Sequence, residues 1–136
     1  MEAQREDDRI YVRLDRGEKV IEKLEELREE YNITNGFFIG IGAVDKVILG
    51  NYNVEKRDYK EKEFEGSFEV SNFKGNIGPD KIHAHITLAD ESFQGKAGHC
   101  SSAIVSGTFE ILILLSKNTE LRHKFDQETG LDVFDL

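Results

Sequence analysis

Residues 107–115 form the run GTFEILILL, which restricts the folds that this chain can adopt. Successive side chains of a β-strand point to opposite faces, so Phe109, Ile111 and Ile113 would share one face while Leu112 and Leu114 share the other. A strand that is apolar on both faces needs cover on both sides. One helix cannot supply all of it. The run therefore predicts a sheet that folds over itself into a barrel-like shape, or a second subunit that covers the remainder.

The rest of the chain is predicted to hold one helix among many short strands. Residues 18–31 carry an apolar stripe at helical spacing, followed by Asn32 and Asn35-Gly36 as exit signals. Strand patterns occur at residues 10–14, 37–44, 47–52, 63–65, 67–70, 82–89, around position 99 and at 107–115, and the apolar tail 131–136 is expected to add a short closing strand. The predicted class is α+β, a mostly antiparallel and strongly curved sheet of about six or seven strands with one main helix.

Length and composition favour one domain over residues 1–136, with a disordered or loosely held N-terminus at 1–8. The charged N-terminus lacks the apolar segment of a signal peptide, and no apolar run approaches the roughly 20 residues of a membrane helix. The single cysteine, Cys100, allows no internal disulfide. We therefore expect a cytoplasmic protein.

The charge balance argues against nucleic acid as a partner. Eighteen Lys and Arg residues face 27 Asp and Glu residues, which gives a net charge of −9, whereas duplex binding relies on neutralising phosphates. The densest basic cluster, residues 56–62, is interleaved with acids and is expected to be a solvated edge strand or hairpin.

His83, His85 and His99 form the strongest candidate site. His83 and His85 share one face of the expected strand at 82–89. If a hairpin turn centres on Ser92, paired residue numbers sum to 184, which places His99 opposite His85. Directly opposed Cβ atoms lie about 4.5–5.5 Å apart, so the three imidazoles would converge. A slip of one residue would separate them.

Three neutral imidazoles suit Zn²⁺ best, and Ni²⁺, Co²⁺, Cu²⁺ or Fe²⁺ are alternatives. Three protein ligands leave a fourth position open, as in catalytic zinc sites, where a bound water can become a nucleophile. The alternative is that these are ordinary surface histidines. Cys100 should face away from the site, and His123 is predicted to be a surface residue.

Glu69 and Glu110 are the candidate acid/base or ligand-orienting carboxylates, because each interrupts an apolar strand. Alternation onto a solvated face explains them equally well. Gly40-Ile41-Gly42 lacks the third glycine and the following helix of a dinucleotide fingerprint, so no such cofactor is expected. The residues alone leave open whether the protein is an enzyme.

Several motifs occur in a familiar order: Gly40-Ile41-Gly42-Ala43-Val44, Leu49-Gly50-Asn51-Tyr52, Phe68-Glu69-Val70, Gly75-Asn76-Ile77, His83-Ala84-His85, Gly98-His99 and Thr108-Phe109-Glu110-Ile111. Together they resemble the plants and prokaryotes conserved domain, the module that follows AT-hooks in plant nuclear proteins and stands alone in bacteria and archaea. The resemblance runs from about Tyr11 to Leu115.

The resemblance implies an antiparallel α+β subunit assembled as a homotrimer, with His83, His85 and His99 as ligands of a metal, zinc above all. Many stand-alone members carry a DNA-binding label. This chain lacks an Arg-Gly-Arg-Pro-type AT-hook and is acidic, so that label transfers poorly. Three hypotheses follow: a metal-binding homotrimer with an unidentified small-molecule or protein partner, a metal-dependent enzyme acting on a small anion through a histidine-ligated water, and a DNA-associated regulator.

Overall fold

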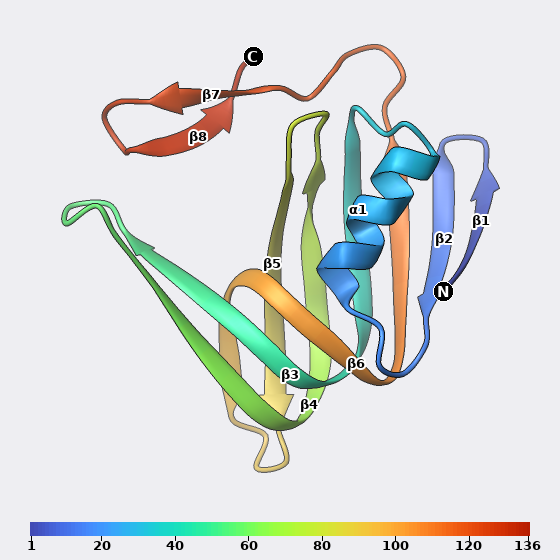
Figure 1. Cartoon of the computed structure of the whole chain (residues 1–136), viewed down its shortest axis with the longest axis vertical. Helices are drawn as coiled ribbons and strands as arrows, with labels where there is room; N and C mark the ends of the chain where they lie inside the picture. The colour runs from blue at the N-terminus through green and yellow to red at the C-terminus, as the bar shows by residue number, and fades with distance from the viewer.

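The chain folds into a six-stranded antiparallel sheet, a separate two-stranded sheet and one helix (Figure 1). The structure, a computed structural model, describes all residues, 1–136. The elements are β1 (Glu2–Glu6), β2 (Arg9–Leu14), α1 (Val20–Glu30), β3 (Gly36–Asn53), β4 (Asp58–Ile77), β5 (Ile82–Asp90), β6 (Gly95–Leu115), β7 (His123–Asp126) and β8 (Leu131–Phe134). The α+β class and the antiparallel sheet are confirmed. No helix has the length and apolar character needed to cross a membrane.

The large sheet closes on itself. Its strand order is β1-β2-β6-β3-β4-β5, and β5 also pairs with β6, so four strands form a ring. β3 has bulges between Gly40 and Gly42 and between Val44 and Lys46, and bulges bend and twist a strand. Figure 1 shows β3, β4 and β6 each turning sharply partway along. Strands predicted separately at 37–44 and 47–52 are therefore one bent strand, and the sheet does fold over itself.

The core lies between the sheet and α1. Phe38, Phe73 and Phe109 stack at its centre, with ring centroids 4.9 and 5.3 Å apart along the row. Helix α1 contributes Val20, Leu24 and Leu27, and ion pairs one turn apart support its solvated side. The predicted helix at 18–31 is confirmed, with observed bounds of Val20–Glu30.

The outer face of the sheet, which points away from α1, stays partly uncovered. Phe109, Ile111 and Ile113 are buried, but Leu114 on the same strand is exposed. Its neighbour in β3, Phe37, is exposed as well. Farther along the same face of β3, Ile39 is 58% and Ile41 is 55% exposed. Closure of the sheet thus buries one apolar face of residues 107–115 and leaves the other face partly exposed.

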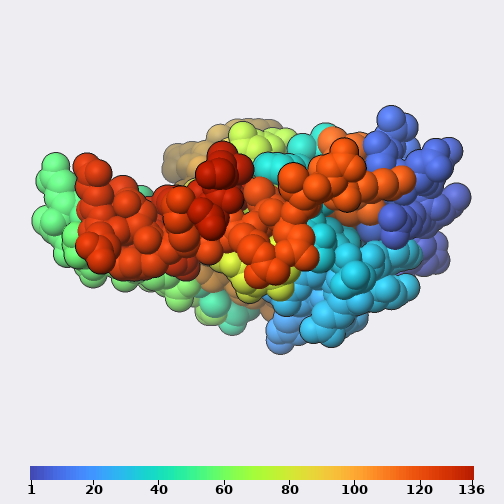
Figure 2. All heavy atoms as spheres, turned by 90° about the horizontal axis from the view of Figure 1, so that it is seen from above, coloured from blue at the N-terminus to red at the C-terminus, as the bar shows by residue number.

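Both ends of the chain form strands. Glu2–Glu6 pair with β2 as strand β1, and the N-terminal ammonium contacts Glu18 at 2.8 Å, whereas the sequence suggested a disordered or loosely held segment at 1–8. The tail does form a strand, but β8 pairs with β7 rather than closing the main sheet. Figure 2 shows these C-terminal residues lying over one end of the molecule, beside the tip of the β3–β4 hairpin.

His123 corrects another prediction. Its side chain is only 3% exposed, because it packs against Phe134, with ring centroids 5.1 Å apart, and against Asp80. Pairing of β7 with β8 places Phe134 directly opposite His123. The sequence around His123 looked solvated because the strand that covers it follows later in the chain.

Candidate metal centre

The turn between β5 and β6 sets the register of the site. The Asp90 carboxylate accepts hydrogen bonds from the backbone N–H groups of Ser92 and Gln94 and pairs with the Lys96 ammonium at 2.6 Å. This turn fixes the pairs Ala89–Gly95 through His85–His99. The predicted pairing of His85 with His99 is therefore confirmed, together with the turn centred on Ser92.

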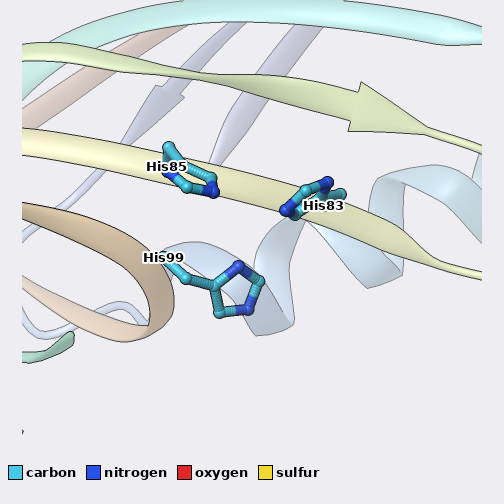
Figure 3. A group of neighbouring side chains, drawn as sticks. All are labelled: His83, His85 and His99. Atoms are coloured by element: carbon cyan, nitrogen blue, oxygen red, sulfur yellow. The ribbon is translucent and has the colours of Figure 1, made fainter. Parts of the chain in front are cut away.

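The three histidines converge on the outer face of the sheet. His83 and His85 project from β5 and His99 reaches them from β6 (Figure 3). One ligand nitrogen from each ring lies within 4.8 Å of the others, and the ring centroids are 5.1, 5.3 and 5.7 Å apart. His83 and His85 are exposed, while Ala84 and Ile86, the residues after each, are buried. The buried face of β5 therefore holds the strand that carries the two histidines in place.

The donor set fits a transition metal. A tetrahedral ion at Zn–N distances of about 2.0–2.1 Å holds its ligand nitrogens about 3.3–3.4 Å apart. The observed spacing exceeds this by at most about an ångström and a half, which rotation of exposed imidazoles can supply. Imidazole nitrogens suit zinc, copper, iron and nickel alike.

The surroundings of His83 and His99 lower the pKa of both imidazoles and so favour the neutral form that binds a metal. Partial burial, followed by the neighbouring His99 and His85, lowers the pKa of His83 to about 4. The pKa of His99 is also lowered, by burial first and then by His85. Among the charges that act on these two rings, Glu61 beside His99 is the one negative group.

The lowered pKa of His83 predicts a pH dependence of the metal-free protein. Its folded-state pKa, about 4, lies below the ordinary value of 6.5, so the folded state disfavours the charged form. The associated stability is fully present above about pH 6.5 and is lost as the pH falls toward 4. Denaturant unfolding at pH 7.0 and 4.5 should show a larger loss for the wild-type chain than for His83→Asn. Equal losses in the two proteins would contradict this.

A second polar cluster borders His99. The Tyr59 hydroxyl lies 3.3 Å from Glu61 Oε1 and 3.2 Å from Ser101 Oγ, and Ser101 Oγ also donates to Glu61 Oε1. The ring of Tyr59 stands edge-on to that of His99, with centroids 6.2 Å apart. Residues 56–62 were predicted to be a solvated edge or hairpin. They do form the β3–β4 hairpin, but Tyr59 and Glu61 also face the site.

Gly50 makes this approach possible. It pairs with His99 on one side and with Glu61 on the other, and a Cβ at this position would overlap the Tyr59 hydroxyl. Because Gly50 has no side chain, the side chains of Tyr59 and Glu61 can extend over β3 toward His99. Sequence reasoning missed this cluster, because its residues come together only through the pairing of β6 with β3 and of β3 with β4.

The other candidate residues lie outside the cluster. Glu69 is exposed and pairs with Ala89, four positions along β5 from His85 and therefore about 13 Å away by strand rise. Glu110 is exposed and pairs with Arg13 and Ile41 on the remote half of β6. Cys100 faces the core, as expected, and burial raises its pKa to about 12.

The closed sheet, single helix and outward-facing histidine triad define a small α+β domain with a candidate metal centre. The chain belongs to the Plants and Prokaryotes Conserved (PCC) domain family, whose model matches residues 1–116. The β7–β8 hairpin lies beyond the matched range. A comparison with curated proteins gives no match.

Three solved structures share the fold over nearly their whole length. A protein of Bacteroides thetaiotaomicron, provisionally named as DNA-binding, is 25% identical, with 98% of this chain and 96% of that chain covered and a TM-score of 0.92. A protein of Ralstonia eutropha with the same provisional name is 28% identical, with 98% and 95% covered and a TM-score of 0.89. A metal-containing protein from Archaeoglobus fulgidus is 28% identical, with 98% and 94% covered and a TM-score of 0.86.

Proposed function

We propose that this PCC-domain protein binds one zinc ion per chain through His83, His85 and His99. The convergence of three ligand nitrogens within 4.8 Å carries the proposal. The metal-containing neighbour from Archaeoglobus fulgidus supports it, as does the lowered pKa of His83 and His99. When bound, the ion would supply a Lewis acid on the outer face of the sheet.

Metal analysis of the purified protein tests this proposal. The chain should carry close to one equivalent of metal, or take up one equivalent of zinc after chelator treatment and dialysis. Competition with nickel, cobalt and copper should show which ion it retains under metal-limited conditions. A correctly folded, demetallated chain that refuses zinc would refute the proposal.

Glu61 should support the metal without contacting it. Its negative charge lies beside His99 and it is held by Tyr59 and Ser101. Groups that support metal ligands typically contribute 10–100-fold in affinity, so we expect Glu61→Gln to weaken zinc binding by roughly tenfold. Glu63→Gln, on the same strand but paired with Lys46, is the matched control. Equal zinc affinities in the two variants would show that Glu61 does not support zinc binding.

We also propose that the chain assembles as a homotrimer through the uncovered outer face. A groove of about 1000 Å³ there is lined by Tyr11, Ile39, Ile41 and Leu112 together with Arg13 and Glu110. An exposed apolar patch rimmed by opposite charges is typical of a protein interface. Light scattering should give three chains per particle, and Ile39→Glu with Ile41→Glu should reduce this number. A wild-type monomer at micromolar concentration would contradict the proposal.

A metal-dependent enzyme is the second candidate, and the exposure of His83 and His85 favours it. Three protein ligands on an exposed face leave room for water or a substrate atom at the ion. Cobalt-substituted protein should change its visible spectrum when azide or another small anion is added. A spectrum insensitive to anions would count against catalysis.

Two neighbours carry a DNA-binding name, but the charges of this chain do not favour DNA as its partner. A net charge of −9 works against phosphate contact, and lysines such as Lys46 and Lys60 pair with acids of the same sheet. If the protein retarded duplex DNA in a gel and this retardation disappeared with added salt, the hypothesis of a DNA-associated regulator would be supported again.

A further inference from the structure

A second hollow lies on the outer face, one strand away from the histidines. Its volume is about 360 Å³. Phe37, Ile39, Leu114 and Phe134 supply most of its apolar wall, and Lys74 and Asn76 supply its polar groups. Ile39 also lines the larger groove on this face. The rings of Phe37 and Phe134 meet edge-on at 6.4 Å between centroids. Part of the wall thus belongs to β8, beyond the residues that match the family model.

Strand pairing places the hollow beside the triad. Asn76 pairs with Phe37 in β3 and with His83 in β5, and Lys74 pairs with His85. Directly opposed residues share a face and have Cβ atoms about 4.5–5.5 Å apart. A molecule seated between Phe37 and Phe134 would therefore lie next to the metal ligands, with Lys74 and Asn76 between it and the ion.

The polar groups of the hollow lack partners within the chain. Lys74 is exposed, and the ion pairs of the other lysines do not include it. Asn76 is only 8% exposed, yet its Oδ1 accepts no hydrogen bond. A buried acceptor without a partner is costly, and native structures normally satisfy such atoms.

We propose that this hollow binds a small hydroxycarboxylic acid with an apolar body. The apolar part packs against Phe37, Leu114 and Phe134, and the carboxylate pairs with Lys74. Asn76 Oδ1 is closed off from solvent, so its carboxamide turns toward the hollow when the ligand binds. A hydroxyl of the ligand then donates to this oxygen and supplies the missing partner. The inference deepens the proposed function, since it places this ligand beside the zinc ligands, but Lys74, Asn76 and the apolar wall do not need the ion.

Mandelate is a suitable probe, because it combines a phenyl ring, a hydroxyl and a carboxylate. Three relatives each lack one feature: lactate lacks the ring, phenylacetate lacks the hydroxyl and mandelamide lacks the charge. Binding would be followed by backbone amide NMR shifts in chelator-treated and zinc-loaded protein. We expect mandelate to shift residues of β4 and β8 in both forms, and each relative to bind several-fold more weakly.

Two variants and their controls localise the binding. Lys74→Met and Phe134→Ala should each weaken mandelate binding by about tenfold or more, as expected for one lost charge-assisted contact or one lost aromatic wall. Lys117→Met and Phe125→Ala, exposed residues outside the hollow, should leave it unchanged. Zinc affinity should be nearly the same in all four variants.

The outcomes separate the two proposals. Mandelate binding by a chain that refuses zinc would uphold the hollow and refute the metal site. Zinc binding without mandelate shifts in either form would overturn the hollow, as would equal binding by Lys74→Met. Selective protection of these residues by a second copy of the chain, with no mandelate binding, would assign the hollow to the subunit interface and also overturn the inference.

Discussion

A chain that carries both His83→Ala and His85→Ala is expected to lose its zinc. The two substitutions remove two of three converging nitrogen donors, and a single imidazole does not hold a zinc ion at physiological metal levels. The loss should be far larger than the roughly 100-fold that removal of a supporting group costs. Zinc affinity measured by competition with a chromogenic chelator would show the change.

Thr87→Ala is the matched control for this pair. Thr87 lies two positions beyond His85 on the same exposed face of β5 but outside the histidine cluster. It should keep wild-type affinity. Both proteins should unfold at similar denaturant concentrations when metal-free, because their substituted side chains are exposed. Retention of zinc by the double variant would show that the ion binds elsewhere.

The second large effect is expected from Gly75→Ala. Gly75 pairs with Ala84, and a Cβ at this position would overlap the backbone carbonyl oxygen of His83 and lie 2.6 Å from the ring of Phe38. A backbone atom cannot move aside as the end of a side chain can. β4 and β5 would have to separate, at a cost of at least about 3 kcal/mol. Denaturant unfolding would measure this, and zinc affinity should fall because His83 shifts.

Gly95→Ala isolates the steric cause. An added Cβ on Gly95 meets no heavy atom within 4 Å, although this residue also lies in a strand that pairs with β5. Its stability should stay within about 0.5 kcal/mol of wild type. If Gly75→Ala were equally stable, the close approach of β4 to β5 described above would be wrong.

The sequence was most informative where a local turn controls the geometry. Asp90, Ser92 and Gln94 form a short loop whose centre determines which residues face each other, so the pairing of His85 with His99 followed from counting. The helix was predictable for a similar reason, since a stripe such as Val20, Leu24 and Leu27 needs only its own period.

Contacts that depend on pairing between distant segments could not be predicted by counting residues. The cluster of Tyr59, Glu61 and Ser101 depends on two strand pairings and on the bare backbone of Gly50. Burial of His123 depends on Phe134, which follows in the next strand. Glu69 and Glu110 interrupted apolar strands in the sequence, yet both face solvent. Alternation alone could not distinguish a solvated carboxylate from a buried functional one.

The central claim is that the three histidines hold a zinc ion, and anomalous X-ray diffraction of zinc-loaded crystals at the zinc edge tests it most directly. We expect one anomalous peak per chain, about 2.0–2.1 Å from one nitrogen each of His83, His85 and His99, and no such peak in the double alanine variant. A peak at other side chains, or none at this triad in a protein shown to contain zinc, would contradict the account.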